Sequence, residues 1–260
     1  MCLHPSPPAA VIGAGWRRCI ARTWAVSPLV FAALLAPAAW AQGAKPTIGN
    51  TPAPRPAYWR ERTSLFRAFA GPADVVMLGD SLTDGAEWQE IFPDQAIVNR
   101  GIDGDTADGV RERLDAVLAL RPLVVVLMIG INDLTDGPGG TGRRSVEATF
   151  ADVRAIVERL VAAGARVVLM STLPCNVTLG AWKSCAAVAP GVRSLNVKLA
   201  GLASARVAWV DLAARLSDTG GLRAEYTFDG VHLNGEGYRV WRDAIAGLMP
   251  AGLQRTRSRR

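Results

Sequence analysis

The chain is poor in histidine and cysteine, the side chains that most often bind transition metals. Two of its 260 residues are histidine, His4 and His232, and four are cysteine. Cys2 and Cys19 lie near the start of the chain, and the other two cysteines have no second pair or nearby histidine beside them. Such a set does not complete a zinc site. The cysteines therefore predict no metal site, and the acidic residues Asp103, Asp105 and Asp108 are expected to act in turns and caps, with cation binding as the weaker alternative.

The chain also lacks a basic domain, although its formal net charge is +6. Residues 1–41 contain three arginines and no acid, and residues 251–260 contain four arginines and no acid. Without these seven, 22 of the 29 basic residues remain against 23 acidic residues, a charge near −1. This balance excludes a basic nucleic-acid-binding domain. The basic tail is predicted to be a disordered end, with only a weak contact to anionic surfaces as the alternative.

A long uninterrupted apolar run, as a membrane span needs, is missing as well. The first 41 residues instead have the three parts of a secretory signal. Three arginines precede an apolar stretch from Ala25 to Trp40, which two prolines interrupt, and Ala-Trp-Ala at 39–41 fits the small-x-small cleavage pattern. The stretch is too short and broken for a good span. We expect cleavage after Ala41 and a periplasmic or secreted protein, with an uncleaved anchor as the alternative.

Cys175 and Cys185 remain after this predicted cleavage. They are ten residues apart, and in an oxidising compartment such a pair is a disulfide candidate. Closing so short a loop stabilises the folded state by roughly 2–3 kcal/mol. Two unpaired thiols are the alternative interpretation.

The rest of the chain alternates short apolar runs with amphipathic segments and shows no internal repeat. We expect a signal peptide at 1–41, a proline-rich lead-in at 42–57, one domain at 58–250 and a basic tail at 251–260. Short continuous apolar runs are typical of parallel strands buried on both faces. Here they cover residues 73–78, 96–99, 123–129, 165–170 and 205–210. Helices are predicted over 106–120, 145–163 and 236–248. This alternation predicts an α/β fold with a parallel sheet between two layers of helices.

Polar residues and a glycine lie just after the predicted strands. Ser81 follows the first strand, Gly104 lies in the turn after the second, and Asn132 follows the third. Asp229 and His232 lie in the loop after the fifth. Taken singly, each is typical of a helix cap or a turn. Because ligands bind at the carboxyl ends of parallel strands, all five are expected at one edge of the sheet.

Together these residues supply the parts of an acyl-transfer site. That chemistry needs a nucleophile, a base, a carboxylate that orients the base, and donors for the developing oxyanion. Ser81 is the candidate nucleophile, and His232 has no rival as the base because His4 lies in the predicted leader. The serine is not in a G-x-S-x-G elbow, and the turn near Gly104 is not the G-x-G-x-x-G of dinucleotide sites.

Four sequence blocks resemble the SGNH, or GDSL, hydrolase family. They are G-D-S at Ser81, N-R-G-I-D-G-D at Gly104, G-I-N-D at Asn132, and D-G-V-H, which holds Asp229 and His232. The resemblance covers roughly residues 73–248, and the blocks appear in the family's order. The stretch from 99 to 114 is similar to platelet-activating-factor acetylhydrolase-like and lysophospholipase-like esterases.

The resemblance implies a three-layer α/β/α sandwich with a five-stranded parallel sheet, of the flavodoxin-like type. It implies that Ser81 is the nucleophile, that His232 is the base and that Asp229 orients it. The oxyanion donors would be the backbone N–H groups of Ser81 and Gly104 and the side chain of Asn132, with Gly101 as a competitor for Gly104. No cofactor is implied.

The resemblance therefore predicts an exported serine esterase without a metal or cofactor. Its substrates would be short acyl or acetyl esters of carbohydrates or lipids. An envelope O-acyltransferase that uses the same site and a non-catalytic envelope binding protein are the alternatives.

Four further residues carry smaller expectations. Asp80 and Asp133 are expected to brace the motif loops by hydrogen bonding, and Asp105 to act in a turn or cap. The segment 175–190 is interpreted as a loop insert in which Trp182 either lines the substrate site or packs within the loop.

Overall fold

The computed structural model describes residues 55–135, 144–179 and 184–251. The predicted signal peptide, nearly all of the lead-in and residues 252–260 of the basic tail lie outside the described residues, as does Trp182. The domain boundaries and the cleavage site therefore stay predictions.

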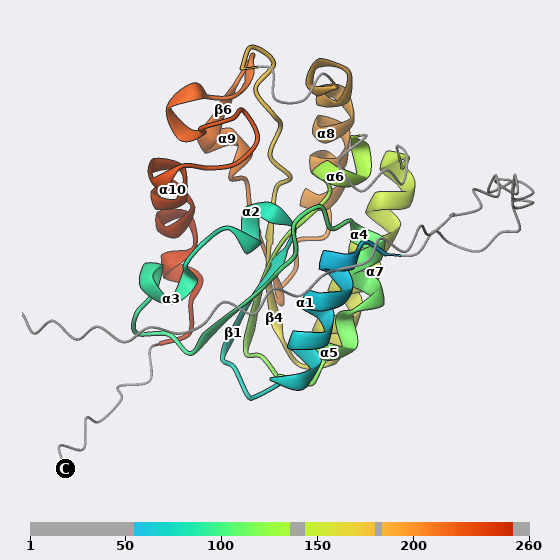
Figure 1. Ribbon diagram of the computed structural model, residues 1–260, viewed down its shortest axis with the longest axis vertical. Helices are drawn as coiled ribbons and strands as arrows, with labels where there is room; N and C mark the ends of the chain where they lie inside the picture. The colour runs from blue at the N-terminus through green and yellow to red at the C-terminus, as the bar shows by residue number, and fades with distance from the viewer. Residues whose placement is uncertain (1–54, 136–143, 180–183, 252–260) are drawn as a thin grey trace, which may run out of the picture. The chain divides into compact units, whose positions relative to one another are not determined.

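Five parallel strands form the central sheet (Figure 1). Their order is β2-β1-β3-β4-β5, the flavodoxin-like order. All five predicted apolar runs are strands, and every residue of β1 and β3 is buried, which explains why these runs are continuously apolar. The strands are β1 Val75–Gly79, β2 Ile97–Gly101, β3 Val124–Met128, β4 Arg166–Met170 and β5 Val207–Val210.

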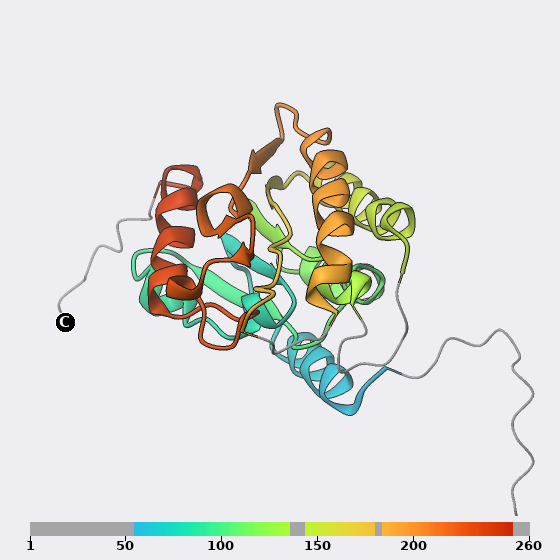
Figure 2. The ribbon, with the colours of Figure 1, turned by 90° about the horizontal axis from the view of Figure 1, so that it is seen from above.

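Helices cover both faces of the sheet, as Figure 2 shows with α10 on one side and α7 and α8 on the other. One layer comprises α4 Ala107–Glu112, α5 Leu114–Leu118, α6 Ile131–Leu134, α7 Val146–Ala162 and α8 Cys185–Ala200. The opposite layer comprises α2 Ser81–Asp84, α3 Trp88–Ile91, α9 Ala213–Leu216 and α10 Gly235–Ile245. The chain also forms a short hairpin of β6 Ser217–Asp218 and β7 Gly221–Leu222 and two 3₁₀ turns, η1 Ala224–Tyr226 and η2 Ala246–Leu248. The predicted three-layer sandwich is confirmed.

The predicted helix boundaries are partly correct. For α7 they agree with the structure: the Ser145 hydroxyl accepts the N–H of Ala148 at 3.1 Å, and Gly164 follows the helix with a φ of +93°. The single helix predicted over 106–120 is wrong, because Arg113 leaves the helical conformation and separates α4 from α5. The last predicted helix is α10 followed by the 3₁₀ turn η2.

The interpretation of residues 175–190 as a loop is wrong in its second half. Helix α8 begins at Cys185 and continues through Pro190 to Ala200. The predicted disulfide between Cys175 and Cys185 is present, with 5.6 Å between the Cα atoms, and both residues are buried. It joins the start of α8 to the segment that follows β4.

A further helix, α1 Ala57–Ala68, precedes the sheet and packs beside α5 (blue in Figure 1). It begins where the predicted lead-in ends. Trp59 and Phe66 of α1 form a small separate apolar cluster with Ile102, which follows β2.

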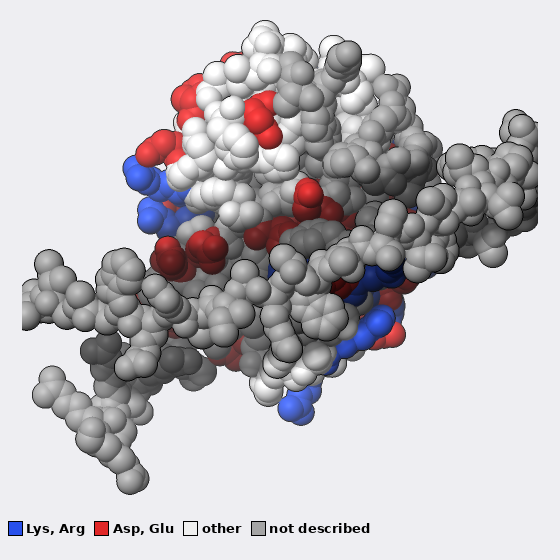
Figure 3. Space-filling view, viewed as in Figure 1, with Lys and Arg blue, Asp and Glu red and all other residues white. Residues whose placement is uncertain are grey.

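Charged side chains do not gather into one large basic patch on the face in Figure 3. There, the Lys and Arg side chains of the described residues form small groups beside acidic ones. Among the described helices, none is long and apolar enough to cross a membrane. Within the same residues, no group of three or more His, Cys, Asp or Glu side chains is arranged to hold a metal ion.

Candidate active site

Ser81 is the first residue of α2, directly after β1. Gly79, the last residue of β1, lies so close to the neighbouring strand that a Cβ there would collide with the carbonyl oxygen of Met128. Asp80 caps the helix, and its Oδ1 accepts the N–H of Leu82 at 3.1 Å. The local sequence therefore places the Ser81 hydroxyl at the carboxyl edge of the sheet.

Asp229 and His232 lie in a turn that the aspartate itself organises. Asp229 Oδ1 accepts the N–H groups of Val231 and His232, both at 2.8 Å. Gly230 has a φ of +92°, which favours glycine. Thr227 closes the turn by donating its hydroxyl to the carbonyl oxygen of His232 at 2.6 Å.

A continuous hydrogen-bonded chain joins the three side chains. His232 Nε2 lies 3.0 Å from Ser81 Oγ, and His232 Nδ1 lies 2.6 Å from Asp229 Oδ2. Burial acts to raise the pKa of Asp229, but the hydrogen bonds from the His232 ring and from two backbone N–H groups outweigh it and lower that pKa. Asp229 is therefore a carboxylate at neutral pH, able to orient the imidazole and to stabilise its protonated form.

Two potential oxyanion donors follow the strands on either side of β1: Gly104 lies after β2, and Asn132 lies in α6 after β3. Gly104 has a φ of +70°, and no described residue accepts a hydrogen bond from its N–H. The N–H of the competitor Gly101 already donates to Asn99 Oδ1 at 2.8 Å, which favours Gly104. Asn132 Nδ2 donates one hydrogen to the carbonyl oxygen of Asp105 at 2.9 Å, and an amide nitrogen carries a second.

Buried aspartate side chains brace these loops. Asp133 accepts the N–H of Ala107 at 2.9 Å, and Asp80 caps α2, so both interact as the sequence predicts. Burial raises the pKa of Asp80 to about 8 and that of Asp133 to about 7. Asp105 does more than act in a turn, because its buried carboxylate pairs with Arg113 at 2.7 Å.

Arg113 and helix α1 also contribute to the site, and neither was predicted from the sequence. Arg113 lies three residues after Val110 and next to Leu114, so helical periodicity places it on the apolar face, and this signal could have identified it. Tyr58 and Trp59 of α1 carried no comparable signal, because no motif connects them to the strand ends.

Ser81 and His232 open into a cavity of about 520 Å³. The Phe228 ring stacks on His232 with 5.9 Å between centroids and is 71% exposed. Among the described residues, no Lys or Arg lines this cavity. It is lined by Tyr58, Ser81, Asp84, Gly85, Asp103, Phe228, His232, Leu233 and Tyr238.

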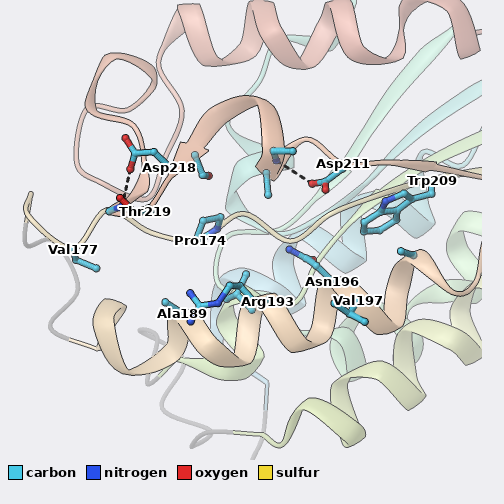
Figure 4. A pocket seen from close by; sticks show the side chains of 17 residues that line it. Pro174, Val177, Ala189, Arg193, Asn196, Val197, Trp209, Asp211, Asp218 and Thr219 are labelled. Atoms are coloured by element: carbon cyan, nitrogen blue, oxygen red, sulfur yellow. Dashed lines mark hydrogen bonds between the residues drawn. The ribbon is translucent and has the colours of Figure 1, made fainter.

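A larger cavity, of about 920 Å³, lies between α8 and the chain around β6 and β7 (Figure 4). Arg193 and Asn196 of α8 and Trp209 of β5 are among its lining residues. It shares no lining residue with the cavity at Ser81. The hydrogen-bonded triplet, and not cavity size, therefore identifies the candidate active site.

Comparison with known proteins identifies the family of the chain. Residues 77–240 match the model of the GDSL-like Lipase/Acylhydrolase family. No curated protein sequence matches the chain significantly.

Among solved structures, a protein described as an acylhydrolase from Bacteroides fragilis is 28% identical, with a TM-score of 0.65 over 73% of this chain and 94% of the other. A GDSL-like lipase from Bacteroides thetaiotaomicron is 26% identical, with a TM-score of 0.64 over 74% and 96%. A protein from Streptococcus pneumonia described as a platelet activating factor is 26% identical, with a TM-score of 0.61 over 74% and 91%. The family match covers more than half of the chain, and the neighbours share its fold. The chain therefore belongs to the GDSL-like lipase/acylhydrolase family and is a hydrolase of ester bonds.

Proposed function

We propose that this protein is an exported serine esterase that hydrolyses short acyl esters, with Ser81 as the nucleophile. The observation that carries the proposal is the chain of two hydrogen bonds, 3.0 Å from Ser81 Oγ to His232 Nε2 and 2.6 Å from His232 Nδ1 to Asp229 Oδ2. A base within hydrogen-bond reach of a hydroxyl can take its proton as the hydroxyl attacks.

In the proposed reaction, His232 Nε2 takes the Ser81 proton while Oγ attacks the ester carbonyl. The tetrahedral intermediate collapses, the alcohol leaves with the proton from His232, and the acyl group stays on Ser81. Water then attacks the acyl-enzyme, with His232 again as the base, and the free acid leaves. Asp229 keeps Nδ1 protonated and stabilises the imidazolium in both halves.

The developing oxyanion would be held by three donors: the N–H groups of Ser81 and Gly104 and the Asn132 side chain. Each donor lies in the connection that follows a strand: Ser81 begins α2 after β1, Gly104 follows β2, and Asn132 lies in α6 after β3. Each such donor contributes about 3–4 kcal/mol to lowering the barrier. Because β1 lies between β2 and β3, these three loops meet at one place along the edge of the sheet.

The residues that line the cavity favour a substrate whose alcohol portion is uncharged. Asp84 and Asp103 line it together with the aromatic rings of Tyr58, Phe228 and Tyr238. Because Asp84 pairs with Arg62 at 2.9 Å, Asp103 is the carboxylate expected to repel an anionic group near the scissile bond. Aromatic faces, in contrast, pack on apolar or sugar-like surfaces. A short acyl group agrees with the sequence resemblance to acetylhydrolase-like esterases. Acetyl esters of carbohydrates or lipids therefore remain the proposed substrates.

Hydrolysis of p-nitrophenyl esters, from acetyl to palmitoyl, tests the catalytic proposal. Wild-type protein should release p-nitrophenol, fastest with the shortest chains, and Ser81→Ala should lose nearly all turnover while staying folded by circular dichroism. Wild-type turnover in Ser81→Ala would refute the nucleophile. An acylated sugar, formed in place of free acid when a carbohydrate is added, would instead indicate an acyltransferase.

Export is the second part of the proposal. The arginines, apolar stretch and Ala-Trp-Ala site of residues 1–41 support it, and so does the Cys175–Cys185 disulfide, since such bonds persist in oxidising compartments. Expression of the full chain in a bacterial host, followed by N-terminal sequencing of periplasmic protein, should give Gln42 as the first residue. Full-length protein confined to the cytoplasm would contradict export.

A further inference from the structure

We infer that helix α1, which precedes the matched family domain, holds the proposed oxyanion loop in its working geometry, and that Trp59 is the positioning residue. The oxyanion loop is defined here as residues 102–105, which contain Gly104. The inference rests on the proposed function and extends it to a part of the chain outside residues 77–240.

The first connection runs from Trp59 to the residue after Gly104. The indole Nε1 of Trp59 donates to Asp105 Oδ1 at 3.0 Å, and both residues are buried. The backbone oxygen of the same Asp105 accepts from Asn132 Nδ2 at 2.9 Å. Asp105, which α1 holds, therefore follows the proposed donor Gly104 in the sequence and is hydrogen-bonded to the proposed donor Asn132.

The second connection reaches the residue before Gly104 through Asp84. Asp84 Oδ2 accepts the Asp103 N–H at 3.2 Å and the Tyr58 hydroxyl at 2.7 Å. Asp84 Oδ1 accepts from Arg62 of α1 at 2.9 Å. Because Asp84 also belongs to α2, the helix that begins at Ser81, this carboxylate connects α1, the nucleophile helix and the oxyanion loop.

The third connection is apolar. Ile102, at the start of the oxyanion loop, is fully buried and clusters with Trp59 and Phe66 of α1. Side chains of α1 thus reach Ile102 and Asp105 directly and Asp103 through Asp84. Gly104, the remaining residue of the loop, keeps its φ of +70° between neighbours that are held on both sides.

Such support affects the transition state more than the bound substrate. Oxyanion donors act only where negative charge develops, and they must lie about 2.7–3.1 Å from that position. A small displacement of the oxyanion loop therefore lowers kcat and leaves KM almost unchanged. Loss of the Trp59 hydrogen bond alone does not leave Asp105 unpaired, because Arg113 still donates to its Oδ2 at 2.7 Å.

Trp59→Phe in the full chain tests the inference, since it keeps a ring in the apolar cluster and removes the indole N–H. Steady-state kinetics with p-nitrophenyl acetate, normalised to titrated active sites, should show kcat about tenfold lower and KM changed less than about twofold. This loss is smaller than the roughly 10²–10³-fold that follows removal of an oxyanion donor, because Gly104 and Asn132 are still present. Trp209→Phe is the matched control, on β5 at the opposite edge of the sheet from β2. It should keep wild-type kcat.

A double mutant separates positioning from general destabilisation. If Trp59 acts through the oxyanion loop, Trp59→Phe should reduce kcat less in an Asn132→Ala background than in the wild type. Equal reductions in both backgrounds would refute the coupling. Tyr58→Phe removes the hydroxyl that donates to Asp84 and should also lower kcat. Because Tyr58 is half-exposed, this variant provides the test if Trp59→Phe does not fold.

The outcomes distinguish this inference from the proposed function. Wild-type protein without esterase activity, or an active Ser81→Ala variant, would overturn the function and with it the inference. An active wild type with unchanged kcat in both Trp59→Phe and Tyr58→Phe would overturn the inference alone.

Discussion

Ser81 and His232 are 151 positions apart in the chain, yet their reactive atoms lie 3.0 Å from each other. The parallel sheet explains this proximity, because Ser81 leaves the carboxyl end of β1 and the loop that follows β5 returns across the same edge. The role of each residue depends on its immediate partners. Asp229, for example, uses one carboxylate oxygen to shape its own turn and the other to hold the imidazole.

Asp229→Asn should separate these two roles. The carboxamide oxygen can still accept the N–H groups of Val231 and His232, so the turn should persist. An uncharged amide neither fixes the productive tautomer nor stabilises the imidazolium, and we expect kcat to fall by about 10³–10⁴-fold. Kinetics with p-nitrophenyl acetate, alongside thermal unfolding as the folding control, measure this. A kcat less than tenfold below that of the wild type would contradict the proposed role of Asp229 in orienting His232.

Helix α2 is a single turn long, so its N-terminal cap accounts for much of its local order. The cap residue, Asp80, is fully buried, and this burial raises its pKa to about 8, with the nearby Asp105 and Asp133 carboxylates acting in the same direction. In the unfolded chain its pKa returns to about 3.9. The native state therefore binds one more proton than the unfolded state between these two pH values, and stability should fall as pH rises from about 4 to 8.

Asp80→Asn should weaken this pH dependence, since the amide oxygen can still cap α2 but the side chain no longer titrates. The difference in free energy of unfolding between the variant and the wild type should therefore be more favourable to the variant at pH 8 than at pH 5. Urea unfolding at both pH values tests this. Asp133, whose pKa is raised to about 7, should leave a residual slope of the same sign. An unchanged slope would exclude Asp80 as its source.

The disulfide acts on another element, the segment between β4 and α8. Cys175 is followed by Asn176, whose N–H donates to the carbonyl oxygen of Gly230 in the turn that carries Asp229 and His232, at 2.7 Å. The segment thus supports the turn that carries Asp229 and His232. A bond that closes a loop of ten residues constrains the unfolded chain as well.

We expect replacement of both Cys175 and Cys185 by serine to lower the free energy of unfolding by about 2–3 kcal/mol. Urea unfolding of the variant, compared with wild type with and without reductant, measures the change. Reductant should destabilise the wild type and leave the variant unaffected. Equal stability of wild type and variant under oxidising conditions would show that the bond contributes nothing.

At the scale of the whole molecule, the two ends of the chain are basic and the remainder is close to neutral. The formal charge of +6 comes from the two ends. The cavity at Ser81 is lined by two carboxylates and, among the described residues, by no basic side chain. The overall positive charge therefore does not predict a preference for anionic substrates.

A matched pair of substrates tests this conclusion. The methyl ester of 4-acetoxybenzoate should be hydrolysed with a kcat/KM about tenfold higher than the 4-acetoxybenzoate anion, a difference of about 1.4 kcal/mol. Added salt should narrow the gap, because it screens partly exposed charges. Asp103→Asn should also narrow the difference in kcat/KM between the two substrates. An anion that is hydrolysed as well as its ester would contradict the proposed selectivity.

The sequence by itself determined the parts of this protein that depend on local patterns. Continuous apolar runs predict all five strands, since a strand buried on both faces needs apolar residues at every position. The motif blocks place Ser81, Gly104, Asn132, Asp229 and His232 at one edge, because parallel strands end together. The cysteine spacing predicts the disulfide, since the pair closes a short loop.

Only the tertiary structure decided what depends on contacts between distant segments. Arg113 separates α4 from α5 and pairs with the buried Asp105 at 2.7 Å, and although periodicity places Arg113 on the apolar face, it names neither this partner nor the break. The helical start of α8 coincides with Cys185, at the disulfide, and the interpretation as a loop missed it. The contact of Trp59 with Asp105 spans 46 positions and has no motif. Periodicity and motifs record neighbours along the chain, whereas these contacts form only when packing brings separate elements together.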